Sequence, residues 1–540
     1  MNAERFLTPR LANHQPLTPV DLLWRAATAY PEKIAVIDGE RRLTWRAFAQ
    51  FVRRFASVLR SRGVHSGDVV AIIAPNCLEM LAAHYAVPMI GAVLNTINTR
   101  LDHESVAYIL AHAEARLLLV HESCRPLAVP ATTSMASPCP ALGIGGNERE
   151  LESLLADALE LHEQAITDEW QPICLNYTSG TTGRPKGVVY HHRGAYLNAL
   201  ASTLTLGFSL HTRYLWVLPM FHCNGWAHTW SITAAGGTHV CLERVDAEHI
   251  LRLLASEAIT HLCCAPVVLY LLINHPSFAA LSLAQRVTIG TGGAAPTATL
   301  IAALEGAGLQ LLHLYGLTES FGPATFSPEQ SGWVELSPEE KAVRLALQGV
   351  EHPLAGELRV VDESMQALPC DGTSVGEIVL RGNTVMAGYY RDEAATEQAF
   401  AGGWFHTGDL GVRHPNGHLE LKDRAKDIII SGGENIASIE IESVLQVHPA
   451  VLIAAAVAMP HEKWGEVACA FVEVKAQATA PSERELIELC RSHLARFKVP
   501  QRIIFADIPK TATGKMQKYL LRQRARELVG DVDQKAPTDA

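Results

Sequence analysis

The residues best suited to chemistry lie in segment 177–187, whose sequence is YTSGTTGRPKG. Its glycines let backbone N–H groups face a ligand without an obstructing side chain. Its hydroxyl residues add hydrogen-bond donors, and Lys186 adds a compact positive charge. The apolar residues Ile173, Cys174 and Leu175 predict a strand that ends where this loop begins. The pattern predicts a loop that binds a polyphosphate, in preference to a flexible surface loop.

The segment lacks the P-loop pattern, in which Gly-Lys is followed by Ser or Thr. Lys186 is followed by Gly187, and the pair Gly514-Lys515 is followed by Met516. The predicted polyphosphate loop therefore has another architecture.

The composition indicates a folded protein with sizeable cores. Of the 540 residues, 48% are hydrophobic and 19% are charged, a balance that argues against disorder. A chain of this length has room for several domains. The formal net charge of −11 disfavours a general nucleic-acid-binding protein.

Cysteine usage and the absence of targeting signals favour a cytoplasmic location. The chain has 11 cysteines and no C-x-x-C pair, which predicts reduced thiols. His414 and His418 have metal-motif spacing, but the Pro-Asn-Gly between them predicts a turn. The N-terminus lacks an apolar signal segment, and the last residues match neither a peroxisomal address nor a prenylation motif. Residues 78–97 include Glu79 and Pro88 and predict a buried helix and a strand, not a membrane span.

The elements that must position the loop alternate between strand and helix. Residues 33–38 and 68–73 predict strands, and residues 45–62 predict a helix between them. This order predicts an α/β fold with mostly parallel sheets. Residues 133–168 are less regular and indicate an exposed insertion or a peripheral helix. Residues 327–344 indicate a surface loop that is helical near its end.

A domain boundary is expected near Asp423. We predict a large N-terminal domain over residues 1–424 and a small, mobile α+β domain over residues 425–530. A charged helix is expected at residues 517–528, and residues 531–540 are expected to be disordered.

Eight segments, in this order, resemble the signature motifs of the adenylate-forming superfamily. This family includes acyl-CoA synthetases, nonribosomal adenylation domains and firefly luciferase. Besides the loop, the segments are residues 218–226 (LPMFHCNGW), 292–296 (GGAAP), 315–320 (YGLTES), 404–409 (WFHTGD), 423–427 (DRAKD), 431–435 (SGGEN) and 509–515 (PKTATGK). The wording is most similar to plant acyl-activating enzymes and bacterial short- to medium-chain acyl-CoA ligases.

The resemblance implies a reaction in two steps. A carboxylate is a poor acyl donor, so ATP first converts it to an acyl-adenylate and releases pyrophosphate. CoA then displaces AMP to give the thioester. The co-substrates implied are ATP and CoA, and the implied metal is Mg²⁺, which would offset the repulsion between carboxylate and triphosphate.

The resemblance also assigns roles to the nucleotide-binding residues. The phosphate-binding residues would be Thr178, Ser179, Gly180, Thr181, Thr182, Gly183, Lys186 and Thr318. Glu319 would be the Mg²⁺ ligand, since a carboxylate is the hard oxygen donor this ion prefers. The adenine- and ribose-binding residues would be Gly293, Ala294, Ala295, Tyr315, Asp409 and Arg424. His313 departs from the family, in which Asn or Asp is common at this position.

Three further residues resemble the family's moving parts. Lys515 would be the catalytic lysine that reaches the forming anhydride. Lys426 would be the hinge about which the small domain turns after adenylation. Gly433 would then line the CoA tunnel. Lys510 and Lys518 are expected to be surface charges.

The acyl pocket is expected beside His222, Trp226 and Gly316. The alternative is that the aromatic residues of this segment belong to the core. Glycine at 316, where acetate-specific relatives have tryptophan, predicts a deeper pocket. No acid occurs in residues 218–226, which disfavours amino-acid substrates.

These observations predict an AMP-forming acyl-CoA synthetase, an enzyme of lipid metabolism acting on short- to medium-chain fatty acids. Its partners would be a carboxylic acid, ATP and CoA, without nucleic acid or an integral membrane segment, and a homodimer stays open. The alternatives are an enzyme with a carrier-protein thiol as acceptor, an aryl-acid CoA ligase, and a catalytically silent nucleotide-binding protein.

Overall fold

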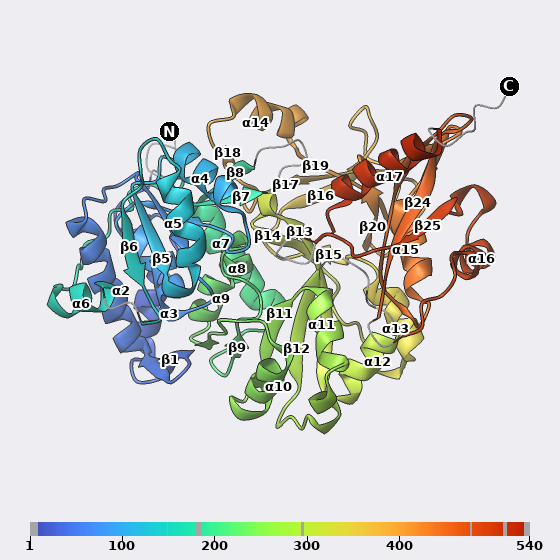
Figure 1. Ribbon diagram of the computed structural model, residues 1–540. Coiled ribbons are helices and arrows are strands. Elements are labelled where there is room, and N and C mark those ends of the chain that lie inside the picture. Colours follow the sequence, from blue (N-terminus) through green and yellow to red (C-terminus); the bar gives the residue numbers. More distant parts are fainter. Residues whose placement is uncertain are drawn as a thin grey trace, which may run out of the picture.

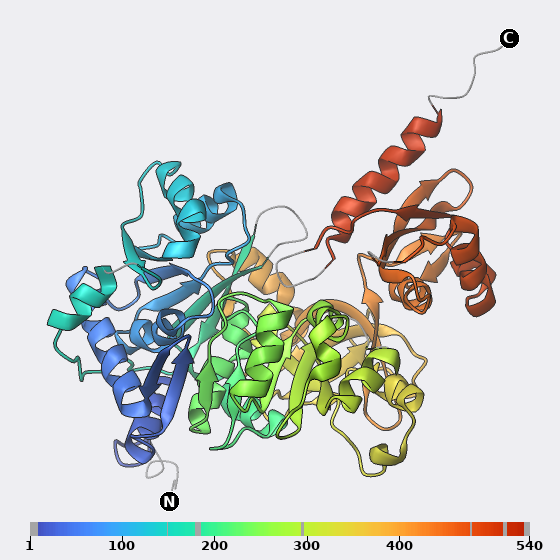
Figure 2. The same cartoon turned by 60° about the horizontal axis from the view of Figure 1, so that its bottom comes forward.

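The computed structural model describes residues 9–147, 150–178, 185–292, 296, 298–475, 478–510 and 516–533. In this part of the chain, two large sheets with helices form most of a large domain, and a four-stranded sheet completes it (Figure 1). A fourth sheet and its helices form a small domain. The small domain lies beside the large one (Figure 2) and contacts its strand Leu419–Arg424 (β20).

The first sheet carries the predicted phosphate loop. Among the described residues its strand order is β18-β8-β7-β4-β3-β5-β6. The strands span Val69–Ile73 (β3), Val93–Thr96 (β4), Leu117–His121 (β5), Ala141–Ile144 (β6), Pro172–Thr178 (β7), Lys186–His191 (β8) and Gly388–Tyr389 (β18). The strands from β7 to β6 are parallel, whereas β8 and β18 are antiparallel additions at one edge.

The second sheet has the order β15-β14-β13-β12-β11-β9-β10-β1-β2 within the described residues. Its strands span Ile34–Asp38 (β1), Arg41–Thr44 (β2), Arg213–Leu215 (β9), Thr238–Val240 (β10), His261–Cys264 (β11), Val287–Gly292 (β12), Leu309–Leu317 (β13), Gly322–Phe326 (β14) and Val350–Glu351 (β15). It is parallel from β13 to β1, and both edges are antiparallel.

The two remaining sheets meet at the expected domain boundary. The antiparallel sheet of the large domain contains Glu357–Val361 (β16), Gly376–Arg381 (β17), Phe405–Arg413 (β19) and Leu419–Arg424 (β20). The small domain contains Ile429–Ser431 (β21), Glu434–Ile436 (β22), Val451–His461 (β23), Gly465–Val474 (β24) and Arg502–Phe505 (β25). The sheet therefore changes between Arg424 and Ile429, around the predicted hinge.

Helices cover the sheets. In the large domain they are Val20–Ala29 (α1), Trp45–Ser61 (α2), Leu78–Met89 (α3), His103–His112 (α4), Arg125–Thr133 (α5), Glu150–Asp157 (α6), His192–Leu206 (α7), Cys223–Trp226 (α8), His228–Ala234 (α9), Ala247–Ser256 (α10), Pro266–Ile273 (α11), Ala298–Gly306 (α12), Pro338–Leu345 (α13) and Glu393–Ala399 (α14). In the small domain they are Ser438–Gln446 (α15), Glu483–His493 (α16) and Lys518–Asp533 (α17). Short 3₁₀ turns occupy Glu122–Cys124, Pro276–Ala280, Thr318–Ser320 (η4), Trp333–Glu335, Ala401–Gly403 and Arg496–Lys498.

Helix α3 explains the longest apolar stretch of the sequence. All twelve of its residues are buried, as expected for a helix that is hydrophobic all round. Its one carboxylate, Glu79, is 2% exposed and accepts a hydrogen bond of 2.5 Å from Arg41. Since a buried carboxylate needs a partner, this contact allows Glu79 to lie in a core helix. No helix within the described residues has the length and apolar character needed to cross a bilayer.

The predicted fold class is confirmed, whereas two predictions of secondary structure are wrong. Residues 141–144 of the supposed peripheral segment form β6, which pairs with β5 and is mostly buried. The expected disordered tail begins too early, because α17 continues to Asp533. Residues 534–540 lie outside the described part.

Lys510 and Lys518 are not the surface charges expected from the sequence. Lys510 pairs with Glu473 at 2.6 Å, and its side chain is 23% exposed. Lys518 pairs with Glu442 at 2.7 Å, and its side chain is 11% exposed. Their partners come from β24 and α15, so no local sequence pattern marks either pair.

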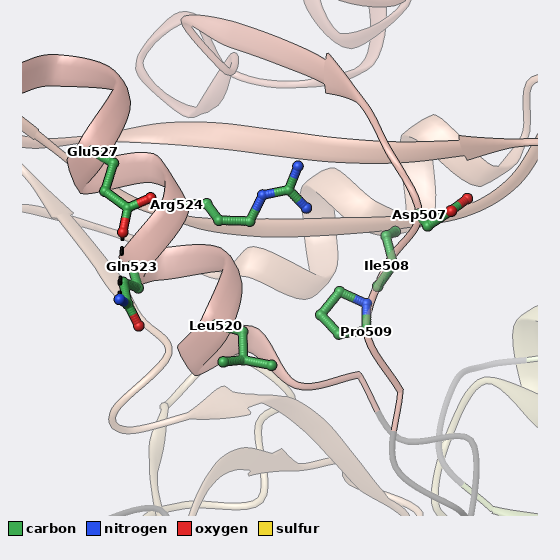
Figure 3. A pocket seen from close by; sticks show the side chains of 7 residues that line it. All are labelled: Asp507, Ile508, Pro509, Leu520, Gln523, Arg524 and Glu527. Carbon is green, nitrogen blue, oxygen red and sulfur yellow. Dashed lines mark hydrogen bonds between the residues drawn. The ribbon is translucent and has the colours of Figure 1, made fainter. Parts of the chain in front are cut away.

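Helix α17 lies along the segment that follows β25. A groove of about 470 Å³ separates them, lined by Ile508, Pro509 and Leu520 and by polar residues of the helix. Figure 3 shows Leu520 and Pro509 facing the groove, with Gln523 bonded to Glu527 one turn further along α17. The groove lies beside α17 in the small domain. The residues predicted to bind the nucleotide, from Thr178 to Arg424, lie in the large domain, so the groove is not part of the predicted nucleotide site.

Candidate active site

The two ends of the phosphate loop are held side by side. Thr178 ends β7, Lys186 begins β8, and the two residues are direct partners in the antiparallel ladder. The prediction that the loop leaves a strand end is therefore correct. Ser179, Gly180, Thr181, Thr182 and Gly183 lie outside the described residues.

Lys186 and Glu319 meet through an aromatic ring from a distant part of the chain. The Lys186 ammonium lies 4.8 Å from the ring centroid of Tyr389, within cation–π range. The Tyr389 hydroxyl donates to Oε1 of Glu319 at 3.0 Å. Burial and the nearby Glu319 carboxylate raise the pKa of Tyr389, so its hydroxyl stays a donor. Tyr389 thus fixes both the predicted phosphate-binding cation and the predicted metal ligand.

Thr318 lies between a tyrosine and a cysteine. Its carbonyl accepts from the Tyr190 hydroxyl at 2.7 Å. Its hydroxyl accepts from the Cys223 thiol at 3.5 Å, and that sulfur lies 3.9 Å from Nε2 of His222. Burial alone would raise the pKa of Cys223, but His222 and the neighbouring hydroxyls outweigh it, and the pKa is lowered. Thr318 therefore links the phosphate side of the site to the segment of His222.

The predicted adenine and ribose residues form a second connected group. The Tyr315 hydroxyl donates to Oδ2 of Asp409 at 2.8 Å, and Nε of Arg424 lies 3.1 Å from Oδ1. The Asp409 side chain is only 3% exposed. Its Oδ1 makes no hydrogen bond to the described residues, so it has capacity to accept from a ribose hydroxyl. Gly293, Ala294 and Ala295 lie outside the described part.

His313 is buried in the sheet. It is 0% exposed, and its Nδ1 lies 2.6 Å from the carbonyl oxygen of Leu345. This nitrogen therefore donates to the backbone. The departure from the family pattern at this position has a structural role in tying β13 to the end of α13.

The segment that carries Trp226 has a left-handed backbone. Residues 223–227 all have positive φ, from 49° at Cys223 to 62° at Gly225. Such a conformation costs about 1–2 kcal/mol for each residue with a Cβ. Asn224 is fully buried, and its Oδ1 accepts from Asn176 of β7 at 2.8 Å. That contact fixes the turn to the strand that leads into the phosphate loop.

The turn places Trp226 over the ends of two strands. A Cβ added to Gly322, at the start of β14, would lie 3.1 Å from Cδ1 of Trp226. A Cβ on Gly292, at the end of β12, would lie 3.8 Å from its Cη2. Trp226 keeps intermediate exposure, so part of the indole faces the space in front of these strand ends.

Gly316 does not leave space in the way expected from the sequence. A Cβ there would lie 2.7 Å from the Pro323 Cα, against the backbone of β14. The residue is nevertheless exposed. Close packing of β13 against β14 therefore requires glycine at position 316. A ligand could contact only the exposed backbone of this residue. Pocket depth cannot be inferred from the missing side chain alone.

A small polar cavity of about 40 Å³ lies beside these residues. Its wall includes Thr318, His222, Cys223, Asn95 and Asn176. The cavity therefore adjoins both Thr318, which is predicted to bind the α-phosphate, and the segment of His222, which is predicted to border the acyl group.

The predicted hinge and CoA residues lie in and next to the small domain. Lys426 follows the end of β20 and is exposed, as is Gly433. Burial of part of its side chain lowers the pKa of Lys426. A Cβ on Gly433 would have no atom within 4 Å, so this glycine lines no tunnel in the present domain orientation. Lys515 lies outside the described residues.

Sequence reasoning did not find Tyr389, Tyr190 and Cys223. Tyr389 reaches the site only because β18 pairs with β8, a long-range pairing that no local pattern indicates. Cys223 stands inside one of the quoted motifs, and its position next to His222 was the one available signal.

Comparisons with known proteins agree with this arrangement. The family model for AMP-binding enzymes matches residues 23–390, and that for the AMP-binding enzyme C-terminal domain matches residues 440–515. The chain is 42% identical to an acetate–CoA ligase of Humulus lupulus over 97% of both chains. It is also 42% identical to a peroxisomal acetate/butyrate–CoA ligase of Arabidopsis thaliana over 96% of both chains. Among solved structures, the anthranilate CoA ligase AuaEII in complex with anthranoyl-AMP has a TM-score of 0.87 at 25% identity, with 97% of this chain and 100% of that one covered.

The chain belongs to the AMP-binding enzyme family. The resemblance stated from the motifs is therefore confirmed, and so is the enzyme class, an acid–thiol ligase of the acyl-CoA synthetase type. The roles of individual residues stay predictions.

The close approach at Gly316 predicts a stability effect. Gly316→Ala should lower the free energy of unfolding by about 1–3 kcal/mol, because the new methyl group must push β14 away. Gly306→Ala is the control, since a Cβ there meets nothing within 4 Å and alanine favours a helix. Urea denaturation of both variants measures the difference, and equal effects would contradict the packing argument.

The contact between Tyr315 and Asp409 predicts an effect on nucleotide binding. Tyr315→Phe keeps the ring but removes a hydrogen bond to a carboxylate, which is worth about 1.5–3 kcal/mol. The KM for ATP should rise about tenfold to a hundredfold. Tyr85→Phe is the control, because that buried hydroxyl donates to Thr229 and Thr233, away from the site. An unchanged KM in Tyr315→Phe would show that Asp409 does not bind the nucleotide.

Proposed function

We propose that the protein is an AMP-forming CoA ligase for short carboxylic acids. The observation that carries this proposal is the continuous series of contacts Lys186–Tyr389–Glu319, with Thr318 directly before Glu319 in the sequence. A cation and a hard oxygen ligand are thus connected next to a hydroxyl donor, a combination that suits a triphosphate. The group of Tyr315, Asp409 and Arg424 would hold the nucleoside.

Mg²⁺ fits this site. No group of three metal-ligating side chains occurs among the described residues, and Mg²⁺ typically takes one or two carboxylates together with substrate phosphates. Glu319 would supply the carboxylate, held in place by the Tyr389 hydroxyl. When bound, the ion would neutralise charge on the phosphate oxygens.

The first step would be attack of the acid on the α-phosphate. Thr318 would donate its hydroxyl proton to an α-phosphate oxygen, and Lys186 would stabilise the departing pyrophosphate. Lys515 would stabilise the charge that develops between acid and phosphate. Because each group would hold charge where the transition state develops it, their main contribution is electrostatic.

The second step would require another domain orientation. The loop of Gly433 is exposed in this structure, so it must move to reach the acyl-adenylate. We propose rotation about Lys426, as the family resemblance implies. CoA would then attack the acyl carbon with AMP as the leaving group.

Short acids are proposed as substrates on two grounds. The acetate and acetate/butyrate ligases are 42% identical to this chain, and so is a butyrate–CoA ligase of Arabidopsis thaliana. Trp226 would limit the length of the acid, because its indole stands in front of Gly292 and Gly322. The alternative is that a carrier-protein thiol accepts the acyl group in place of CoA. Turnover that depends on CoA would exclude this alternative.

A cytoplasmic location is proposed from the thiols. All 11 cysteines are free, and ten are buried, as expected where disulfides do not form. The Arabidopsis acetate/butyrate ligase is named peroxisomal. Fluorescent fusions to the N-terminus and to the C-terminus should therefore distinguish a cytoplasmic from a peroxisomal location.

A panel of acids tests the proposed function. AMP release should depend on CoA and be fastest with acids of about two to five carbons, including branched ones. Lys515→Ala should lower pyrophosphate–ATP exchange by about 10²–10³-fold while thioester formation from preformed acyl-adenylate is largely retained. AMP release that does not respond to CoA, or equal loss of both half-reactions in the variant, would contradict the proposal.

The position of Trp226 predicts the chain-length profile. Trp226→Ala should raise kcat/KM for hexanoate and octanoate about tenfold or more relative to acetate, since each accommodated methylene is worth about 1–3 kcal/mol. Trp170→Ala is the control, because that indole is exposed and packs on His191, whereas the indole beside Gly292 and Gly322 is that of Trp226. An unchanged profile in Trp226→Ala would place the end of the pocket elsewhere.

A further inference from the structure

A buried polar network lies at the junction of the two domains. Its centre is Lys518, whose ammonium lies 2.7 Å from Oε1 of Glu442 and donates to Oγ of Ser438 at 2.5 Å. Ser438 is 0% exposed and Glu442 is 5% exposed. Glu442 also accepts from the backbone N–H of Ala456 at 2.8 Å. The network therefore joins α17, α15 and β23 of the small domain.

The same network extends across the predicted hinge. The Ser438 hydroxyl donates to Oδ2 of Asp423 at 2.7 Å, and the Ser438 N–H donates to the same oxygen at 2.5 Å. Asp423 is 1% exposed and lies in β20 of the large domain. Burial alone would lower the pKa of Lys518, but Glu442 and Asp423 more than offset it, and the pKa is raised. The charged form of Lys518 is therefore favoured by carboxylates of both domains.

A second contact holds the other side of the hinge. Arg522 of α17 forms an ion pair with Asp427 and donates to the carbonyl oxygen of Lys426 at 3.4 Å. Residues 424–426 are therefore flanked by two carboxylates, and both are attached to the small domain.

The two attachments respond differently to a rotation about Lys426. Asp427 and Arg522 both follow the hinge in sequence and would move together. Asp423 precedes the hinge and Ser438 follows it, so a large rotation must break their contact. The contact belongs to an orientation in which Gly433 is exposed, which is not the one proposed for thioester formation.

We propose that Asp423 and Ser438, supported by Lys518 and Glu442, form a latch that holds the small domain in its orientation before thioester formation. These are positioning residues, because none is among the residues predicted to bind a substrate. The proposal rests on the proposed two-step reaction and its hinge. Since Lys518 follows Lys515 by three residues, the latch also couples the start of α17 to the hinge.

The test uses the full-length chain with Asp423→Asn and, as a milder change, Ser438→Ala. Asp423→Asn weakens two hydrogen bonds to a charged group and should lower pyrophosphate–ATP exchange about tenfold or more. Thioester formation from preformed acyl-adenylate should be unchanged or faster. Ser482→Ala is the matched control, because Ser482 also stands at the start of a helix of the small domain, α16, and forms its hydrogen bonds with Glu485 of that helix.

A second measurement does not depend on activity. Tryptic cleavage after Lys426 in the unliganded chain should be about tenfold faster in Asp423→Asn than in the wild type. Cleavage after Arg484, an exposed site in the small domain, should keep its rate and thereby exclude general unfolding.

The outcomes separate the latch from the proposed function. Cleavage after Lys426 at the wild-type rate in both variants would overturn the latch, as would equal loss of both half-reactions. A wild-type chain inactive with every acid would overturn the proposed function. In that case faster cleavage in the variants would still support a latch between the two domains.

Discussion

The antiparallel pairing of β7 with β8 is the constraint on which the site depends. It sets Thr178 opposite Lys186 and so fixes the two ends of the phosphate loop. Strand β18 then pairs with β8 and brings Tyr389 over Lys186. Through Tyr389 the constraint reaches Glu319, which stands at the end of the second large sheet. Strand β18, which pairs with β8 at the edge of the first sheet, thus contacts Glu319, which follows β13 of the second sheet. In the proposed function, a triphosphate would bind where these two sheets meet.

Much of the fold follows from patterns that a single stretch of chain contains. The helix at Trp45–Ser61, the buried helix at Leu78–Met89 and the alternation that gives parallel sheets are local signals of length and hydrophobicity. Strand β6 was missed because Ala141–Ile144 is four residues long and lies between irregular segments. The burial of Lys518 was missed for another reason. Its charge is offset by Glu442 of α15, and only tertiary structure places that carboxylate beside it.

The site divides in the same way. Motif spacing predicts Lys186, Glu319, Tyr315 and Asp409 as site residues, and the structure brings them into two connected groups. Gly316 does not open the pocket by lacking a side chain, because that side chain would point against the backbone of β14. The left-handed turn at residues 223–227 shows the converse case. Its backbone is unfavourable for each residue with a Cβ, yet the buried Asn176–Asn224 contact and the bare Cα of Gly225 beside Trp216 maintain it.

The distribution of cysteines has a practical consequence for measuring domain motion. Cys370 is exposed, while the other ten cysteines are buried. It lies in the connection between β16 and β17, on the large domain and outside the polar network of the hinge. A maleimide dye or nitroxide should therefore attach at one place in the natural chain. A second cysteine introduced on the outer face of α16 would complete a donor–acceptor pair, without first removing the native thiols that fill the cores.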